Sequence, residues 1–181
     1  MKKAPPISYF LSFNLLTTTR RRHHVPPQPK LWFENLRACF KDAFKIRIAR
    51  KDGKALAGMM TFRHKDTIVY KYGGSDSRYN NLGPMHLLYW KTIQDGKSLG
   101  LRFFDLGRTD AAQSGLITFK NRWGAKQRSL TYSRFALQEY PSHLFEQAPS
   151  KLGATAARKL IAFVPNRVLS LMGQLLYKHI G

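Results

Sequence analysis

Residues 70–124 constrain the fold more than any other part of this chain, because apolar runs and chain-breaking residues follow one another there in a defined order. The run TIVYKY is β-branched and aromatic, and two glycines end it, as expected of a strand that leads into a turn. Pro84 suits the first turn of a helix, and Gly100 follows the last apolar residue of the helical pattern as a left-handed cap. The segment predicts strand, turn, helix, strand, loop and short helix.

Charged residues follow the second strand of this segment. The run LRFFDLG is typical of a short buried strand that ends at Gly107. Asp105 and Arg108 are therefore expected at the C-terminal end of the strand, the edge where ligands collect in open α/β sheets. The helical stretch GLITFKNRWGA then brings Lys120. We expect two strand ends and one helix start to deliver Asp105, Arg108 and Lys120 to one region.

The charge of the chain indicates a polyanionic partner. Its 181 residues include 31 basic and 10 acidic side chains, a formal net charge of +21. Such an excess favours RNA, anionic lipid or a phosphorylated substrate, and the alternative is a protein that is merely basic. A single cysteine excludes an intrachain disulfide and favours a reducing compartment. No apolar run reaches the roughly 18 residues of a membrane span, so we expect a cytoplasmic protein.

Composition divides the chain into three parts. Residues 1–30 have no acidic side chain and contain TTTRRRHHVPPQPK, which predicts an extended basic linker. Residues 31–140 hold a helical stretch, two strands joined by the turn KDGK, a second turn at HKDT, the segment described above and a final strand, RSLTYSRFAL. Residues 141–181 predict a helical tail.

Two helical stretches have an apolar face. The first, over residues 31–45, is expected to bury Trp32, Leu36, Cys39, Phe40 and Phe44. The last, in the tail, aligns Val168, Leu171, Met172, Leu175 and Leu176. Because no acidic residue occurs from residue 151 onward, this basic helix is expected either to lie on an anionic membrane surface or to pack on its own or another domain.

The order of helix, antiparallel meander, helix, strand and helix is that of the GNAT acyltransferase fold, an α/β (α+β) fold. We therefore expect a mixed central sheet flanked by helices, with a C-terminal helical extension. The motifs YGGSDSRYNNLGP, LLYWKTI, GLRFFDLGR and GLITFKNRWGA resemble the second, C-terminal domain of the Fem-type peptidoglycan-bridge aminoacyltransferases and their exosortase-associated relatives. TRRRHHVPPQP with WFENL is similar to the junction between the two domains of that family. The resemblance covers residues 15–135.

The resemblance implies transfer of an aminoacyl or acyl group to an amine of a cell-envelope precursor related to peptidoglycan or exopolysaccharide. It implies aminoacyl-tRNA or acyl-CoA as donor, no tightly bound cofactor, and a lipid-linked or nucleotide-linked precursor as anionic substrate. Members of the family carry two such domains, so a first GNAT-like domain or a second copy of the chain is the expected partner. Peripheral contact with the inner face of the membrane is a further expectation. The alternative is a non-catalytic half of a split transferase that binds RNA or envelope precursors.

Lys120 aligns with the lysine of the family's FK motif, which implies a cation that stabilises the tetrahedral oxyanion of acyl transfer. A solvated helix lysine is the alternative. Asp105 would accept a proton from the attacking amine or orient Arg108, and Arg108 would clamp a phosphate or carboxylate. The alternative for Asp105 and Arg108 is a structural ion pair.

The loop GGSDSRYNNLGP corresponds by this resemblance to the pyrophosphate loop of GNAT enzymes. Asn81 replaces the glycine that allows close approach, so fewer backbone donors are presented and the case for coenzyme A is weaker. Arg78 is expected to hold anionic substrate. The remaining candidates for substrate binding are Tyr72, Ser75, Asn81 and Trp123. Trp90 and Cys39 are expected in the core, and no metal site is expected, because His23 and His24 lack ligand partners.

Overall fold

The structure is a computed structural model that describes residues 7–131, 133 and 164–177. The chain divides into two compact units. The first comprises Met1–Gly107 with Leu160–Gly181, and the second comprises Arg108–Lys159.

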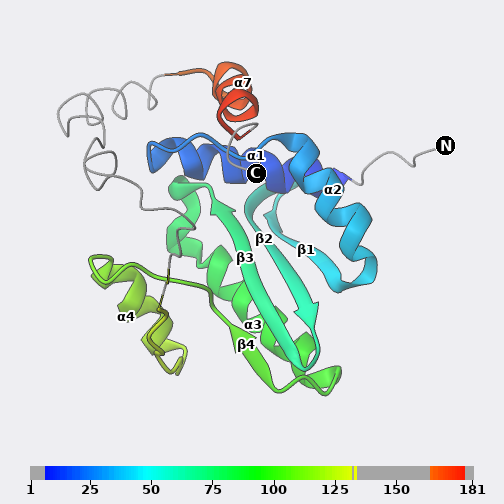
Figure 1. The fold of residues 1–181 in the computed structure, drawn as a ribbon, viewed down its shortest axis with the longest axis vertical. Coiled ribbons are helices and arrows are strands. Elements are labelled where there is room, and N and C mark those ends of the chain that lie inside the picture. Colours follow the sequence, from blue (N-terminus) through cyan, green and yellow to red (C-terminus); the bar gives the residue numbers. More distant parts are fainter. Residues whose placement is uncertain (1–6, 132, 134–163, 178–181) are drawn as a thin grey trace, which may run out of the picture. The chain divides into compact units, whose positions relative to one another are not determined.

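The first unit is built on a four-stranded sheet with the strand order β1-β2-β3-β4 (Figure 1). The strands β1 (Phe44–Lys51), β2 (Lys54–His64) and β3 (Thr67–Ser75) form an antiparallel meander, and β4 (Phe103–Asp105) pairs in parallel with β3. The two predicted turns are confirmed. Asp52 and Gly53 have φ values of 48° and 74°, and Lys65 has a φ of 51°, as tight hairpin turns require. The mixed sheet confirms the predicted fold class.

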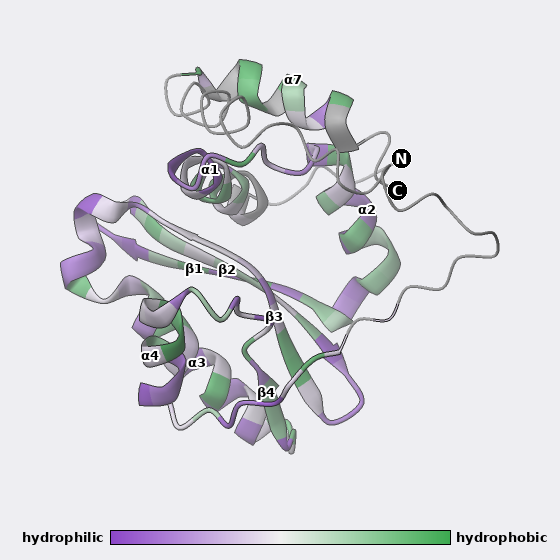
Figure 2. Ribbon diagram, turned by 60° about the vertical axis from the view of Figure 1, so that its left-hand side comes forward, coloured by the Kyte–Doolittle hydropathy of each residue, from purple (hydrophilic) through white to green (hydrophobic). Residues whose placement is uncertain are grey.

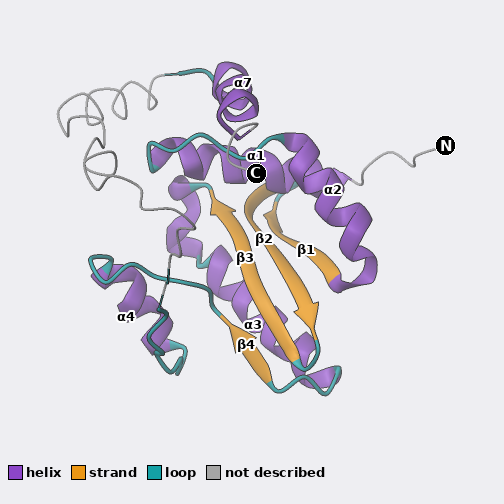
Figure 3. Ribbon diagram, in the orientation of Figure 1, coloured by secondary structure: helices purple, strands orange, loops and turns teal. Residues whose placement is uncertain are grey.

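Helix α3 (Pro84–Ser98) packs on one face of this sheet, and α1 (Ile7–Arg22) and α2 (Lys30–Phe40) cover the other (Figure 3). The predicted limits of α3 are confirmed, with Pro84 in its first turn and Gly100 just past its end at a φ of 70°. Two 3₁₀ helices, η1 (Lys41–Ala43) and η2 (Ser77–Leu82), link α2 to β1 and β3 to α3.

The main apolar core lies between the sheet and the helices α1 and α2. Its aromatic rings meet edge to face: the ring of Phe33 is 5.8 Å from that of Phe13 and 5.0 Å from that of Tyr72. Such contacts add to the burial of the rings. The buried members of the core are Phe13, Leu16, Phe33, Phe44, Met60 and Tyr72.

Helix α1 corrects the prediction of an extended linker, which is wrong for residues 7–22. Phe13, Leu15 and Leu16 of α1 are 9%, 9% and 4% exposed. The helix approaches the sheet closely at Gly74, where an added Cβ would lie 2.5 Å from the carbonyl oxygen of Leu15. The basic, proline-rich composition belongs to the end of this segment, whereas its first half has enough aromatic and aliphatic side chains to order a helix against a sheet.

The predicted apolar face of α2 is confirmed at Leu36, which is half-buried against the core, and is wrong for most of its other members. Phe33 is its fully buried residue, whereas Trp32 and Phe40 are 47% and 46% exposed and Cys39 is exposed. The helix ends at Phe40, so Phe44 begins β1 and is buried from the strand. The core position predicted for Trp90 on α3 is wrong in the same way, because this side chain is 51% exposed.

Two further helices are described. In the second unit, α4 (Ser114–Arg122) confirms the predicted short helix. Residues 128–131 and 133 are not in a strand, and the rest of the strand predicted over 128–137 lies outside the described residues. In the tail, α7 (Asn166–Tyr177) is a helix as expected, whereas residues 134–163 lie outside the described part. No described helix is long and apolar enough to span a bilayer. The three-part division of the chain stays a prediction.

Candidate active site

The parallel strands β3 and β4 pair only over a short stretch. Thr67–Val69 pairs with Phe103–Asp105, and β3 then continues to Ser75 while the chain leaves β4. At Gly107, with a φ of 72°, an added Cβ would lie 3.2 Å from the carbonyl oxygen of Tyr70. The chain therefore still lies against β3 at Gly107, just beyond the C-terminal end of β4, the edge where ligands gather in such sheets.

A β-bulge in β3 lies next to this edge. Thr61 of β2 pairs with Tyr70 and Met60 pairs with Tyr72, which leaves Lys71 as the extra residue. A bulge re-aims the side chains that follow it, and bulges are common beside active sites. Here it places Tyr70 and Tyr72 on opposite faces: Tyr70 packs on Tyr89 of α3, and Tyr72 packs on the α2 side.

Tyr72 is tied to α2. The indole Nε1 of Trp32 donates a hydrogen bond of 3.0 Å to the Tyr72 hydroxyl, and Tyr72 is 8% exposed. The structure thus gives Tyr72 a packing position between β3 and α2. Its predicted contact with substrate stays a prediction.

Ser75 is tied to α1. Its backbone N–H donates to Oγ1 of Thr19 at 3.1 Å, and this hydroxyl donates to the Ser75 carbonyl at 3.4 Å. Ser75 itself is 8% exposed. The C-terminal end of α1 is therefore hydrogen-bonded to the last residue of β3. The substrate-binding role of Ser75 also stays a prediction.

Arg78 forms a two-pronged ion pair with Asp76 on the loop between β3 and α3. Its Nη2 lies 2.7 Å from Asp76 Oδ2 and its Nε 3.0 Å from Oδ1. These hydrogen bonds lower the pKa of the Asp76 carboxyl and raise the pKa of the Arg78 guanidinium. The Arg78 side chain is 79% exposed. An exposed pair of this kind is weak, so an incoming phosphate can compete with Asp76 for Arg78.

The same loop uses several backbone donors internally. The N–H of Arg78 bonds to Asp76 Oδ1 at 3.1 Å, that of Tyr79 to the Asp76 carbonyl at 3.1 Å, and that of Gly83 to the Asn80 carbonyl at 3.0 Å. Asn81 is exposed on η2. Donors that are engaged in this way are not directed at a bound pyrophosphate. The weaker case for coenzyme A stays a prediction.

Asp105 is the last residue of β4, as predicted. It is exposed, and its Oδ1 accepts a hydrogen bond of 2.7 Å from the N–H of Gly107. The carboxylate therefore shapes the turn that follows the strand. Its role as proton acceptor remains a prediction.

Two buried phenols lie beneath this edge, and the sequence did not single them out. The rings of Tyr70 and Tyr89 are 5.5 Å apart, and Phe104 of β4 lies 5.7 Å from Tyr89. The hydroxyls of Tyr70 and Tyr89 are hydrogen-bonded, and burial raises the pKa of both phenols. Both therefore stay protonated at neutral pH. Tyr70 lies in the sequence YKY of the strand and Tyr89 in LLYW of the helix. Neither pattern indicates that the two tyrosine rings pack together.

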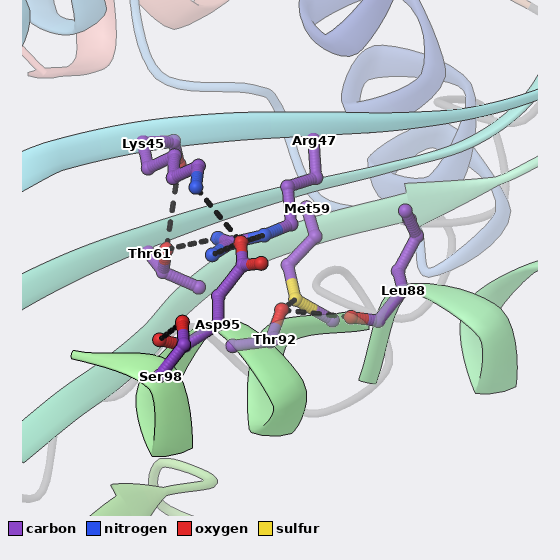
Figure 4. A network of polar contacts seen from close by, with 8 residues as sticks. All are labelled: Lys45, Arg47, Met59, Thr61, Leu88, Thr92, Asp95 and Ser98. Atoms are coloured by element: carbon purple, nitrogen blue, oxygen red, sulfur yellow. Dashed lines mark hydrogen bonds and ion pairs between the residues drawn. The ribbon is translucent and has the colours of Figure 1, made fainter. Parts of the chain in front are cut away.

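A polar network fixes α3 beneath the sheet (Figure 4). Asp95 Oδ2 accepts hydrogen bonds from Lys45 Nζ at 2.8 Å and from Arg47 Nη2 at 2.7 Å, and these bonds lower the pKa of the Asp95 carboxyl. One turn earlier on α3, the hydroxyl of Thr92 donates to the carbonyl of Leu88 at 2.7 Å and lies 3.3 Å from the sulfur of Met59. These contacts set the position of α3 and hence of the loop at its start.

The second unit holds Arg108, Lys120 and Trp123. Lys120 lies in the last turn of α4, so the expectation that it lies at a helix start is wrong. It is 8% exposed. Fully buried lysines are rare unless they are paired, so Lys120 is not the solvated helix lysine of the alternative interpretation. Asp105 belongs to the first unit, and the convergence of Asp105, Arg108 and Lys120 stays a prediction.

Trp123 caps the end of α4, and its N–H bonds to the carbonyl of Lys120 at 3.0 Å. Its side chain is half-buried. Among the described residues, no group of three or more His, Cys, Asp or Glu side chains is placed to hold a metal ion.

Residues 8–121 match the family model described as acetyltransferase (GNAT) domain. The chain belongs to this family. With the GNAT-like fold, membership identifies it as an acyltransferase domain of the GNAT class.

Three similar proteins illustrate the match. The UDP-N-acetylmuramoylpentapeptide-lysine N(6)-alanyltransferase of Weissella viridescens is 26% identical over 112 residues, which cover 60% of this chain and 33% of that protein. The BH1408 protein from Bacillus halodurans, solved as a tetramutant, has a TM-score of 0.57 at 15% identity and covers 75% of this chain and 98% of that one. An aminoglycoside N-acetyltransferase in complex with CoA has a TM-score of 0.54 at 13% identity, and the match covers 68% of this chain and 89% of that one. This chain thus spans about a third of its curated relative's length.

Proposed function

We propose that this chain is a Fem-type acyltransferase domain that transfers an aminoacyl group to an amine of a peptidoglycan-related precursor. The observation that carries the proposal is the buried Lys120 in the last turn of α4. By the resemblance described above it corresponds to the lysine of the FK motif, and the chain is 26% identical over 112 residues to a muramoylpentapeptide-lysine alanyltransferase.

Aminoacyl transfer to an amine needs a fixed positive charge beside the reacting carbonyl and a group that accepts a proton. The amine nitrogen of the acceptor attacks the ester carbonyl of the donor, a C–N bond forms, and the carbonyl oxygen becomes an oxyanion. Lys120 supplies the positive charge beside that oxyanion. Asp105 takes the proton that the amine nitrogen loses and passes it to the leaving oxygen as the ester C–O bond breaks, so that the donor leaves as a hydroxyl.

The donor is aminoacyl-tRNA in this proposal. Arg78 and the internally bonded loop of η2 support it, because the guanidinium is exposed whereas several loop N–H groups are already engaged. The sugar-phosphate backbone of tRNA is bound by exposed cationic side chains and does not require a loop of free protein N–H groups. Arg78 and Arg108 would hold the anionic substrates, and the net charge of +21 suits both of them.

The second candidate is a binding module without turnover. The observation that favours it is that the chain covers 33% of the alanyltransferase, so the remaining part of such an enzyme has no counterpart in the match. In this case the same basic surface would hold tRNA or the precursor for another domain.

Substitution of Lys120 tests the proposal. Transfer of labelled alanine from alanyl-tRNA to a UDP-linked muramoyl pentapeptide is measured for the parent, Lys120→Ala and Lys120→Arg, with Lys126→Ala as an exposed control in the same unit. Loss of one oxyanion donor costs on the order of 100-fold in rate. We expect that loss in Lys120→Ala, partial rescue in Lys120→Arg and no change in the control. Parental turnover by a folded Lys120→Ala variant would overturn the role. A parent that binds tRNA without any turnover would favour the binding module.

A further inference from the structure

The tail helix α7 has apolar side chains on two opposite faces. Leu169 is fully buried and Gly173 is buried, and Gly173 packs directly on the backbone carbonyl of Pro27, so no larger side chain fits between them. This face holds α7 on the first unit, to which both segments belong.

The other face of α7 is open. Val168, Leu171 and Leu175 are 46%, 57% and 70% exposed. Their spacing places them on one stripe of the helix, and hydrophobic positions occur along α7 in Figure 2. A helix that is apolar on two faces normally packs against protein or lipid on both of them. The outer stripe therefore marks an interaction surface.

Charge selects the occupant of this surface. Residues 151–181 contain no acidic side chain, and their basic residues are Lys151, Arg158, Lys159, Arg167 and Lys178. The loop that seats α7 follows the basic end of α1, where Arg20 donates to Gln28 at 3.3 Å and Arg22 is exposed. Exposed leucines in a segment without acidic residues, close to the basic end of α1, match the acyl boundary and headgroups of an anionic bilayer.

We propose that the outer stripe of α7, formed by Val168, Leu171 and Leu175, docks this chain on an anionic membrane surface. The leucines enter the boundary between headgroups and acyl chains, and the arginines at the end of α1 hold the lipid phosphates. The helix lies along the surface and does not cross it. The proposal concerns α7 and not the residues assigned to the transfer reaction, and it goes beyond that reaction.

The test separates the apolar contribution from the bulk charge, because a chain of net charge +21 is attracted to any anionic vesicle. Vesicles of equal parts phosphatidylglycerol and phosphatidylcholine are sedimented with the full chain and with Leu171→Gln/Leu175→Gln, which leaves the charge unchanged. The control is Leu31→Gln, at an exposed leucine of α2 that is 63% exposed. All proteins are compared at about 0.15 M salt, where distant charges are screened.

We expect the α7 variant to lose about tenfold or more in vesicle partitioning, because two leucines no longer enter the boundary, and the control to bind like the parent. Pure phosphatidylcholine vesicles should bind the parent weakly. Equal binding of the α7 variant and the parent would overturn the proposal and leave only bulk charge. A parent that is dimeric by light scattering, becomes monomeric in the α7 variant and binds no vesicles would overturn it too, and would assign the stripe to a second copy of the chain.

Discussion

Substitution of Gly74 by alanine tests the docking of α1 on the sheet. An added Cβ would lie 2.5 Å from the carbonyl oxygen of Leu15, 2.6 Å from its carbonyl carbon and 2.7 Å from the N of Leu16. All of these are backbone atoms of α1, so no rotamer change relieves the clash. Gly74 is not among the glycines with positive φ, and alanine therefore suffers no backbone strain there. The whole cost of the substitution is steric.

The magnitude follows from the contacts. Carbon atoms pack best at about 3.5–4.0 Å, so α1 must move away from β3 by about 1 Å. Overpacking of this kind costs about 1–3 kcal/mol and occasionally more. Complete release of α1 would expose Phe13, Leu15 and Leu16, each contributing about 1.5–3 kcal/mol, which sets a ceiling of about 5–9 kcal/mol. We expect Gly74→Ala to lose about 2–4 kcal/mol, because rigid backbone atoms resist the shift.

Urea unfolding followed by circular dichroism measures the effect. Gly115→Ala is the matched control, because an added Cβ at this position of α4 meets nothing within 4 Å. Its free energy of unfolding should stay within about 0.5 kcal/mol of the parent. Trypsin cleavage after Arg21 or Arg22, at the end of α1, should also be faster in Gly74→Ala than in the parent. A Gly74→Ala variant as stable as Gly115→Ala would refute the described contact between α1 and β3.

Two other substitutions probe contacts that hold the site in place. Asp95→Asn should cost about 1–2 kcal/mol, less than a fully buried pair, because the Asp95 side chain is 37% exposed although that of Arg47 is only 10% exposed. The pKa of Asp95 is lowered in the folded state, so its contribution is present above the unfolded pKa of about 3.9 and is lost as the pH falls through the folded value. The difference between parent and Asp95→Asn in urea unfolding should therefore shrink below about pH 4, and a constant difference down to pH 2 would contradict the pairing. Trp32→Phe removes the hydrogen bond to Tyr72 and should cost about 0.5–1.5 kcal/mol. Urea unfolding measures this cost, with Trp90→Phe, at a tryptophan that is 51% exposed, as the control.

Local chain chemistry explains what the sequence could predict of the fold. Asp52 and Gly53 adopt positive φ in the first hairpin, Pro84 opens α3, and Gly100 follows its end. Each of these residues dictates a backbone conformation by itself or with one neighbour. The hairpins and the limits of α3 therefore needed no knowledge of distant contacts.

Helix α1 was missed because its buried face is partly polar. Ser12 and Thr17 are 3% and 2% exposed, and the hydroxyl of Thr17 donates to the carbonyl of Phe13 at 2.9 Å. Burial of these hydroxyls removes the apolar periodicity by which a helix is found. The glycines that admit α1, Gly58 and Gly74, lie far along the chain, and no local pattern connects them with it.

The sequence predicted the end of strand β4 in the candidate site, but it did not predict the β-bulge in β3. Gly107 stops the chain from continuing the strand, so the position of Asp105 at the end of β4 could be predicted, and it is confirmed. Nothing in YKYGG indicates that Lys71 is an extra residue in the pairing with β2. A one-residue offset exchanges the faces of all residues beyond it. This is why Tyr72 joins the core beside α2, whereas Tyr70 packs against α3.

The charge balance of the described ion pairs connects the two proposals. Within the described residues, the acidic side chains that pair with cations are Glu34, Asp66, Asp76 and Asp95. Since 31 basic side chains face so few acids, most of the positive charge has no internal counterpart and must be matched by solvent ions or a polyanion. That surplus would attract tRNA and anionic lipid alike, and it would weaken steeply with salt in both cases. The apolar stripe on α7 would distinguish them, because exposed leucines contribute to binding a bilayer and contribute little to binding a phosphate backbone.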